Sequence, residues 1–558
     1  MLKFPNMRVE SQGGPAGSLL CIFAALLPLA YATFLFDPYI AGKELVLVGG
    51  AALLALACAA TLREMTVSLF LAPMAVLAAL AAASMARSVR YDTAILFAAG
   101  FALFAVAGAE TQQGAGREKL AATLTTAGTI EAVYVLWQAI AGDPLLPVEA
   151  SPGKWRTFGT FGNPNWAGEF LAIASLVAYG RLAARFTWVR LVCLGLMLAA
   201  LCATFGRGAW LSLVVGAGAM VWLRRDAFLP KLRYAGIAAA GMAATAAGLL
   251  VLHPDMLRYV ANLQSIRGRF WIWLVTARMI WENPWGVGLG NFGLRFPDVQ
   301  ARLFQSAFGQ AFLRNGSFTD QAHNDYLQVV AEVGILALPV LAVLVWRIAA
   351  RGRALQRDPL ALGFWAALLA TMVNALFASP FYLPGSLGLA ALLLGVVQAA
   401  SGFRAVALPR AGRAALCAAA LAACAGAFVW CRDRGIAAYQ IDRASQAIAC
   451  RDLRQATGEL EDARRHEPSR LEIYALLGRV QMAERQFTVA ANTYSQAARL
   501  GPSEDVLRGW ATALWQAGRS GEALQILQQL AWQRPDLEWP RRKLAELRPL
   551  ATQREVAR

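Results

Sequence analysis

The residues best suited to chemistry lie in a short polar segment that runs directly into a long apolar stretch. This segment is Ala322-His323-Asn324-Asp325-Tyr326-Leu327, and Glu332-Val333-Gly334 follows it. An imidazole has an unperturbed pKa of about 6.5, so His323 can accept a proton near neutral pH. The chain has 3 histidines, and His323 alone lies among several other groups that can bond or titrate. The alternative is that His323 is an interfacial or helix-capping residue.

Glu332 lies about two helical turns inside the apolar stretch. An ionisable group at membrane depth is costly and therefore indicates a function. The alternative is structural, with the carboxylate pairing with an arginine to hold the helices together.

Two polar clusters occur earlier in the chain, each at the end of an apolar stretch. The first, from Lys154 to Gly168, contains Asn163-Pro164-Asn165, and its Asn and Thr groups can bond sugars or phosphate. Its alternative is an ordinary turn in which Asn165 caps a helix. The second is Thr204-Phe205-Gly206-Arg207-Gly208, where the flanking glycines let Arg207 point inward. Its alternative is an arginine that reaches out to lipid headgroups.

A third cluster begins at Ser265 and contains two arginines, Arg267 and Arg269. Residues two apart do not share a helix face, so one of the two is the expected ligand. Trp271, Trp273, Trp281 and Trp285 predict a helix lying at the membrane interface. Gly286, Gly288 and Gly290 are similar to a phosphate-cradling loop, but no strand precedes them, so a dinucleotide site is poorly supported.

The elements that position these clusters are membrane-spanning helices. The 558 residues are 58% hydrophobic, with a mean hydropathy of +0.46, which excludes an ordinary soluble protein. About thirteen apolar stretches approach the length that a bilayer requires: 18–36, 45–62, 66–86, 92–109, 119–141, 166–184, 186–204, 208–223, 234–252, 326–348, 359–380, 384–400 and 414–431. The fold class is therefore all-α, a polytopic transmembrane bundle of 12–13 spans, with membrane lipid as one partner.

The net charge of +17 is explained by topology. With a cytoplasmic N-terminus, the alternate loops rich in arginine fall inside, as the positive-inside rule requires. This distribution argues against nucleic acid as a partner. Residues 253–325 then form a large loop on the outer side, together with the four polar clusters. Cys431 and Cys450 would also lie outside, where a disulfide is permitted, although nothing requires them to meet.

Past the last span the composition changes to a charged, amphipathic region, which predicts a separate domain at 435–558 after a membrane domain at 1–432. Ala456, Ala490 and Ala523 recur at 34 and 33 residues, and Pro468, Pro502 and Pro535 recur with the same period. The middle unit matches the tetratricopeptide pattern, which predicts three helical hairpins stacked as an α-solenoid on the outer side. Such a solenoid can bind a protein partner; the alternative is that it only caps the membrane domain.

The clusters, in this order, resemble the O-antigen ligase and O-antigen polymerase superfamily. Asn163-Pro164-Asn165 is similar to the family's turn, Arg207 to its arginine after a span pair, and Arg267/Arg269 to its Arg and Trp segment. His323-Asn324-Asp325-Tyr326-Leu327 with Glu332 matches the most specific signature. Gly206 departs from the pattern, because members often have Ser there.

The resemblance implies a GT-C-like glycosyltransferase of the bacterial inner membrane, with its site and repeats in the periplasm. It implies an undecaprenyl-diphosphate-linked glycan as donor and transfer to an acceptor hydroxyl with inversion, without metal or cofactor. His323 is then the catalytic base, Arg207, Arg267 and Arg269 bind the donor diphosphate, and the support set comprises Asn163, Asn165, Asn324, Asp325 and Glu332.

Several alternatives remain open. The acceptor can be a glycolipid (ligase), the growing glycan chain (O-antigen or exopolysaccharide polymerase) or a protein (O-oligosaccharyltransferase). A polysaccharide transporter is a different class, for which Glu131 and Asn374, within apolar stretches, are the supporting residues. A non-catalytic assembly scaffold would tolerate loss of His323 but not deletion after Gly435.

Overall fold

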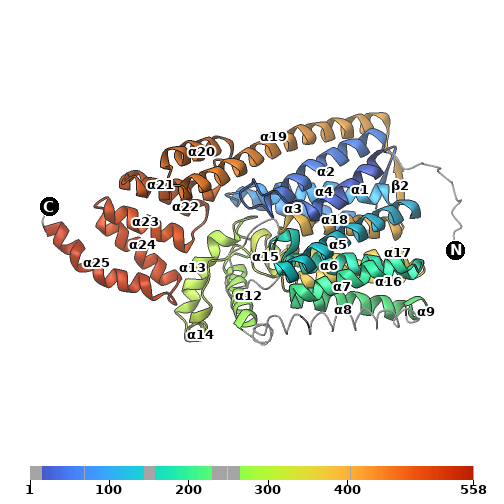
Figure 1. The fold of residues 1–558 in the computed structure, drawn as a ribbon, viewed down its shortest axis with the longest axis horizontal. Helices are drawn as coiled ribbons and strands as arrows, with labels where there is room; N and C mark the ends of the chain where they lie inside the picture. Colours follow the sequence, from blue (N-terminus) through green and yellow to red (C-terminus); the bar gives the residue numbers. More distant parts are fainter. Residues whose placement is uncertain are drawn as a thin grey trace.

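The computed structural model describes residues 15–67, 70–143, 157–228, 264–402 and 404–556, together with Gly248. His253, residues 154–156 and the predicted span at 234–252, apart from Gly248, lie outside these ranges. The described chain is almost entirely helical, as the composition predicts (Figure 1). It also contains one small ribbon, in which β1 (Glu64–Val67) pairs antiparallel with β2 (Arg404–Ala407).

Most of the predicted spans are helices in one bundle. Their bounds are α1 (Pro15–Leu29), α2 (Ala41–Thr61), α3 (Leu71–Ser84) with the turn η1 (Met85–Arg87), α4 (Asp92–Glu110), α5 (Gly114–Ala141), η2 (Gly159–Phe161) before α6 (Pro164–Ala184), α7 (Trp188–Thr204), α8 (Arg207–Leu223), α9 (Arg225–Phe228), α16 (Ala337–Leu355), α17 (Pro359–Asn374) and η5 (Pro380–Tyr382) before α18 (Pro384–Ala400). In the described part of the chain, α2, α4, α5, α6 and the later helix α19 (Arg410–Ala449) are long and apolar enough to cross a membrane.

Helix α6 forms the centre of the bundle. It packs against α5, α7, α8 and α17, and nearly all of its side chains are buried. A Cβ on Gly180 of α6 would lie 2.8 Å from the Pro359 carbonyl oxygen and 2.9 Å from the Gly363 Cα. Small residues let two membrane helices approach closely, and this crossing of α6 and α17 depends on them.

The predicted span at 326–348 is wrong as a single helix. The chain forms a short helix α15 (Asp325–Val333), turns at Gly334 with φ 116°, and starts α16 at Ala337. After the turn, the backbone N–H of Ile335 donates to the carbonyl of Pro284 at 2.8 Å. Hydropathy alone could not reveal this break, because the residues on both sides of it are apolar.

Residues 264–333 form a small helical layer at one end of the bundle. It contains α12 (Gln264–Glu282), α13 (Phe292–Phe304), α14 (Ala307–Gln310), η4 (Leu313–Asn315) and α15 (Figure 1). Trp271 lies in the core of this layer and stacks on Phe304 and Phe312, with ring centroids 4.7 and 5.2 Å apart. The prediction of an interfacial Trp is therefore wrong for Trp271, whereas Trp281 and Trp285 are exposed.

Helix α19 joins the bundle to the C-terminal region without a break. Its 40 residues extend about 60 Å at 1.5 Å per residue, roughly twice the hydrocarbon thickness of a bilayer, so the helix projects well beyond it. Cys431 lies on this helix and Cys450 directly follows its last residue, so the two are about 28 Å apart and cannot form a disulfide. All 8 cysteines are free.

The C-terminal helices form consecutive antiparallel pairs. The end of α19 packs on α20 (Leu453–His466), α21 (Leu471–Ala483) on α22 (Phe487–Leu500), and α23 (Glu504–Gln516) on α24 (Ser520–Gln533), and α25 (Glu538–Val556) ends the stack. Ala456, Ala490 and Ala523 are fully buried at the helix contacts. The geometry is that of stacked helical hairpins, and their assignment to the tetratricopeptide family stays a prediction. These helices are called the repeats below.

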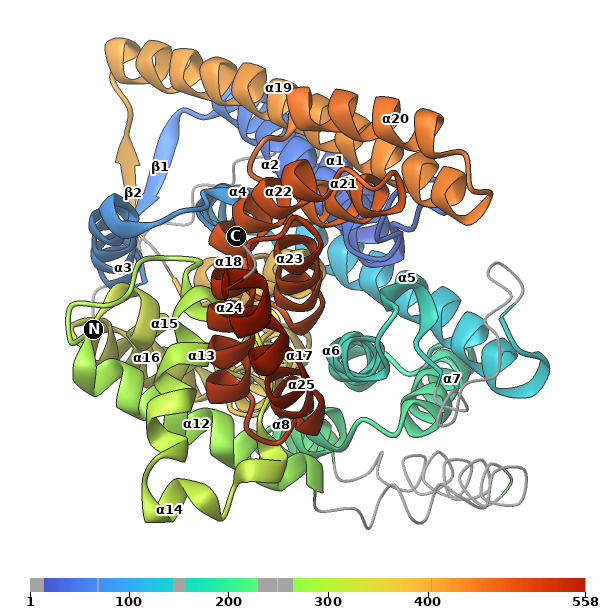
Figure 2. The ribbon, with the colours of Figure 1, turned by 90° about the vertical axis from the view of Figure 1, so that its left-hand side faces the viewer.

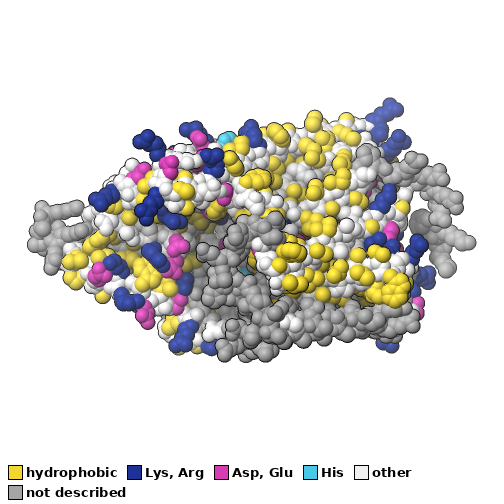
Figure 3. All heavy atoms as spheres, in the orientation of Figure 1, with side chains coloured by type: hydrophobic (Ala, Val, Ile, Leu, Met, Phe, Trp, Pro, Cys, Tyr) yellow, Lys and Arg dark blue, Asp and Glu magenta, His cyan; other side chains and the backbone are white. Residues whose placement is uncertain are grey.

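The repeats and the small helical layer share one end of the molecule, on the left of Figure 1. Viewed from that end, α23, α24 and α25 lie in front of α13 and α17 (Figure 2). An apolar surface covers the visible side of the bundle, and Lys and Arg side chains gather at its far end (Figure 3). This pattern fits a multi-pass membrane protein.

Candidate functional site

His323 lies at the junction between the small helical layer and the bundle. Its backbone is left-handed, with φ 50°, a conformation that costs a non-glycine residue about 1 kcal/mol and often occurs at functional sites. On one side, the Ala322 N–H donates to Gln328 Oε1 at 2.8 Å. On the other, Asn324 caps α15 by accepting the Leu327 N–H at 3.0 Å. The backbone that carries the imidazole is therefore fixed on both sides of His323.

Asp325 fastens the start of α15 to the bundle. Its N–H donates to the Ala375 carbonyl at 2.9 Å, and its Oδ2 accepts the Phe381 N–H at 2.7 Å. The side chain is 1% exposed. Asp325 thus positions the segment that carries His323.

The two predicted arginines of α12 differ in their surroundings. Arg267 is exposed, donates to the Ala311 carbonyl at 3.0 Å and lies over the ring of Phe312. Arg269 is half-buried and acts electrostatically on His323. Burial of the imidazole and the positive charge of Arg269 lower the pKa of His323, whereas Asp320 opposes them. Of the two arginines, Arg269 is the one whose charge acts on the histidine.

Arg207 approaches this region from the bundle. It is the first residue of α8 and donates to the Ser265 hydroxyl at 2.6 Å, which joins α8 to the start of α12. In the next position, a Cβ on Gly208 would lie 2.9 Å from Asn374 Oδ1, at the end of α17. The ends of α8, α12 and α17 therefore meet near the start of α15.

The Asn-Pro-Asn turn adjoins the Arg207 turn. Asn163 caps α6 by accepting the Asn165 N–H at 2.9 Å, so the prediction of Asn165 as the cap is wrong by two residues. A Cβ on Gly206 would lie 3.7 Å from the Pro164 carbonyl oxygen. The structure thus brings Asn163 and Asn165 beside Arg207, and Arg207 beside the helix that carries Arg269.

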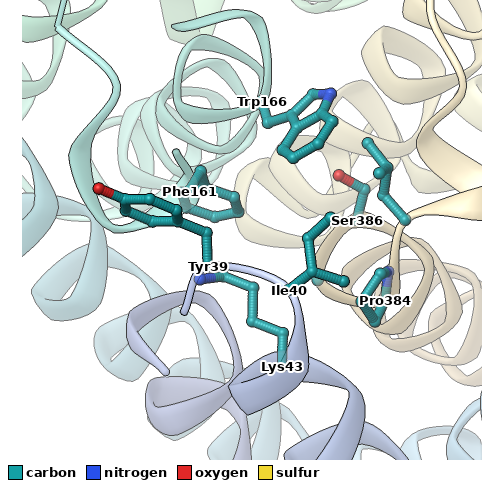
Figure 4. A pocket seen from close by; sticks show the side chains of 9 residues that line it. Tyr39, Ile40, Lys43, Phe161, Trp166, Pro384 and Ser386 are labelled. Atoms are coloured by element: carbon teal, nitrogen blue, oxygen red, sulfur yellow. The ribbon is translucent and has the colours of Figure 1, made fainter. Parts of the chain in front are cut away.

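Glu131 and Lys43 hold the loop before this turn. Glu131 accepts the Thr160 N–H at 3.0 Å and its hydroxyl at 2.8 Å, while Lys43 donates to the Thr160 carbonyl at 2.6 Å. Lys43 also lies over the ring of Phe161, and Figure 4 shows both beside Trp166 in a small pocket between α2, α6 and α18. Glu131 is engaged in fixing a loop, which removes one support for a transporter.

Glu332 serves the architecture of the small helical layer. Its carboxylate accepts the N–H groups of Gly290 and Phe292, at 3.0 and 3.4 Å, and the Tyr382 hydroxyl at 2.9 Å. Within the described residues it forms no ion pair, so the expected arginine partner is wrong. The role of holding helices together is performed instead through backbone N–H groups at the start of α13.

The glycine loop at 286–290 does not cradle phosphate. The Val287 and Gly288 N–H groups donate to the carbonyls of Ala331 and Glu332, and the Gly290 N–H donates to the Glu332 carboxylate. A Cβ on Gly286, where φ is 83°, would lie 2.4 Å from the Glu332 carbonyl oxygen. The glycines are needed because the loop packs directly on the backbone of α15.

An apolar cavity of about 200 Å³ lies between α3, α4, α16, α17 and α18. Tyr326, Val329 and Val333 of α15 line this cavity, so the cavity reaches the helix that directly follows Asn324 and His323. Its lining is almost wholly hydrocarbon, which suits a lipid chain.

Sequence reasoning missed Gln300, a fully buried residue of α13. Its Oε1 accepts the Trp271 Nε1–H at 3.1 Å and the Ser317 N–H at 3.2 Å. Its Nε2 donates to the Ser317 and Gln533 carbonyls, both at 3.1 Å. One amide therefore links α12, the segment that leads to His323 and the repeats. A glutamine on a polar-looking helix carries no sequence signal for such a role.

No group of three or more His, Cys, Asp or Glu that could hold a metal ion occurs among the described residues. The site residues that can interact with an anion are arginines.

Residues 192–342 match the family model described as O-antigen ligase. The match runs from α7 to α16 and includes Arg207, Arg267, Arg269, His323 and Glu332, whereas the Asn163 turn precedes it and the repeats follow it. This part of the chain is therefore similar to the O-antigen ligase family. No curated protein matches the chain significantly.

Proposed function

We propose that the protein transfers a glycan from an undecaprenyl-diphosphate carrier to an acceptor hydroxyl at the outer face of the bacterial inner membrane. His323 removes the proton of the hydroxyl while its oxygen attacks the anomeric carbon. The bond from that carbon to the diphosphate breaks, with inversion, and the diphosphate leaves. A general base of this kind contributes about 10²–10⁴-fold in rate.

The observation that carries the proposal is the electrostatic effect of Arg269 on the buried His323, within the segment similar to O-antigen ligase. Burial and the Arg269 charge lower the pKa of His323, which favours the neutral imidazole, the form that a base requires. The same guanidinium can bond the diphosphate oxygens in a bidentate manner and stabilise the leaving group. Arg207, bonded to Ser265 at the start of the same helix, supplies a second cation.

Arg267 has a smaller role in this proposal. Its contacts with the Ala311 carbonyl and the Phe312 ring hold α12 against the following segment. We assign donor diphosphate binding to Arg269 and Arg207, with arginine charge in place of a metal ion.

The apolar cavity accounts for the lipid carrier. A polyprenyl tail in this cavity would place its diphosphate at the start of α15, near the two arginines. Tyr326 lines the cavity, and its hydroxyl donates to the Met372 carbonyl at 2.9 Å. This bond holds α15 against α17 at the cavity wall.

The acceptor distinguishes a ligase from a polymerase, and the same residues serve both. A glycolipid acceptor makes the protein a ligase, and the growing chain makes it a polymerase. We favour a glycan or glycolipid acceptor over a protein. The repeats contact the segment before His323 through Gln533 and Arg534, so a glycan chain at the site can extend along them.

The test is glycan transfer by His323→Ala in membranes that contain the lipid-linked donor. We expect transfer to fall at least about 10²-fold, with unchanged protein level and thermal midpoint. Transfer near the wild-type level would refute the assignment. In a deletion strain, accumulation of lipid-linked polymer indicates a ligase, and accumulation of single repeat units indicates a polymerase.

A further inference from the structure

An open groove of about 390 Å³ lies between the repeats and the small helical layer. One wall is formed by α22, α23 and α24, and the other by Leu294 and Asp298 of α13. The polar lining on the repeat side includes Asn492, Ser495 and Gln529, and Trp510 contributes an aromatic face. The groove is therefore not a feature of the repeats alone.

Gln533 is the residue that most clearly points to a ligand in the groove. It lines the groove, is 1% exposed, and donates through Nε2 to Asp298 Oδ1 at 2.7 Å. That bond fixes the orientation of the amide, because a carboxylate only accepts. Its Oε1 is then buried with no partner among the described residues. A buried acceptor without a donor is unfavourable, and because Gln533 lines the groove, a ligand hydroxyl that reached this atom would supply the donor.

Side-chain contacts link the wall of the groove to the segment before His323. The Gln533 carbonyl accepts from Gln300, whose amide also holds Ser317. Arg534, the next residue, lies over the ring of Phe318. A chain of contacts therefore leads from the groove wall to Ser317 and Phe318, which lie a few residues before the histidine.

The chemistry of the lining favours a sugar chain over a peptide. Amides and hydroxyls both donate and accept, as the many hydroxyls of a sugar require, and the Trp510 ring offers an apolar surface to a pyranose face. The nearby Arg519 is paired with Glu522, and Asp298 is bonded to Gln533. These pairings leave Arg499 as the lining charge outside such a pair among the described residues, which is little charge for recognising a peptide.

Position gives a second reason. The repeats lie over the end of the bundle where the site is, in front of α13 and α17 (Figure 2). A polymer attached at the site has to extend away from the membrane, and the groove wall begins on the helix that packs beside the site.

We propose that this groove binds the glycan chain at sugars remote from the one being transferred. The inference rests on the proposed function for the identity of the chain. Remote binding energy of this kind lets an enzyme favour long chains over short ones without contacts at the reacting centre.

The experiment uses the full-length protein in lipid nanodiscs. The probes are polysaccharide released by mild acid from the lipid-linked glycan of the source strain, separated into long chains and single repeat units. The test variant is the double substitution Asn492→Ala and Gln529→Ala. The matched control is Gln496→Ala with Gln528→Ala, exposed glutamines of the same two helices that do not line the groove.

We expect the test variant to weaken binding of the long chains about tenfold, the equivalent of about 1.4 kcal/mol, and the control to bind them normally. Transfer of a single repeat unit should be unchanged in both. Equal binding by test and control variants, or no binding of long chains by the wild type, would overturn the proposal.

The two proposals fail separately. In His323→Ala, binding of the long chains should persist while transfer is lost. Persistence of transfer in that variant refutes the catalytic assignment and leaves the groove result standing. Thermal midpoints equal to that of the control show that the groove variant is folded, and all four substituted residues are exposed.

Discussion

Replacing Gln300 with Ala should loosen the small helical layer and the repeats together. The substitution removes four hydrogen bonds made by one buried amide, to Trp271, Ser317 (two bonds) and Gln533. Two buried donors, the Trp271 indole N–H and the Ser317 backbone N–H, then have no acceptor.

The size of the effect follows from these donors. Each buried donor left without a partner costs about 1–3 kcal/mol, so two cost about 2–6 kcal/mol. The two carbonyls add less, because they are acceptors that tolerate partial satisfaction. A net destabilisation of about 3–5 kcal/mol places this change near the upper end for single substitutions.

The assay compares Gln300→Ala with Gln305→Ala, an exposed glutamine at the end of the same helix. For a cooperative unit of 150–250 residues, 3 kcal/mol lowers the thermal midpoint by roughly 6–12 °C, whereas a surface change stays within about 0.5 kcal/mol. Limited proteolysis near Ser317 should also accelerate. Equal midpoints and equal cleavage in the two variants would refute the reasoning.

Three further changes test other parts of the site. In Arg269→Gln, loss of a positive charge beside His323 should raise the imidazole pKa, so the acid limb of the transfer-versus-pH profile should move to higher pH; an unmoved limb contradicts the contact. Glu332→Gln should cost about 2 kcal/mol, because an amide offers one acceptor oxygen to the donors that a carboxylate satisfies with two; its thermal midpoint checks this, and transfer should fall less than in His323→Ala. Gly286→Ala adds a Cβ 2.4 Å from the Glu332 carbonyl oxygen at positive φ and should cost at least about 2 kcal/mol, whereas Gly458→Ala, a helical position in open space, should stabilise by about 0.5–1 kcal/mol. Midpoints that change in the same direction in these two glycine variants would contradict the packing argument.

The bundle could be predicted from the sequence because the hydropathy of a span is a sum over its residues. Apolar residues over about 20 positions define a span regardless of what each one touches. The hairpins could be predicted for a similar reason, since Ala456, Ala490 and Ala523 mark helix contacts that recur with a fixed period. The described structure agrees with both, apart from the break at Gly334.

The site could be predicted only in part, because its geometry depends on contacts between distant segments. The polar clusters indicated which turns matter, but both arginines of α12 were equivalent by type. The structure separates them: Phe312 and Ala311 engage Arg267, whereas the charge of Arg269 acts on His323. The sequence also could not predict the role of Glu332, because its partners are backbone N–H groups about 40 residues away in the chain.

The repeats are attached to the membrane domain at three separate places, which constrains how a deletion can be interpreted. Helix α19 runs into them without a break. Arg434 of this helix pairs with Glu44 of α2 and with Glu467 before α21. Gln533 is bonded to α13.

Removing residues after Gly435 therefore does more than remove a binding surface. It takes away the Gln533 carbonyl that Gln300 bonds and the Arg534 side chain over Phe318, both next to the His323 segment. A scaffold and an enzyme would both fail after such a deletion. Point changes distinguish them: His323→Ala leaves every repeat contact intact, so only an enzyme loses function, and the groove substitutions leave the His323 segment intact, so only a protein that holds its glycan through the repeats changes its preference for chain length.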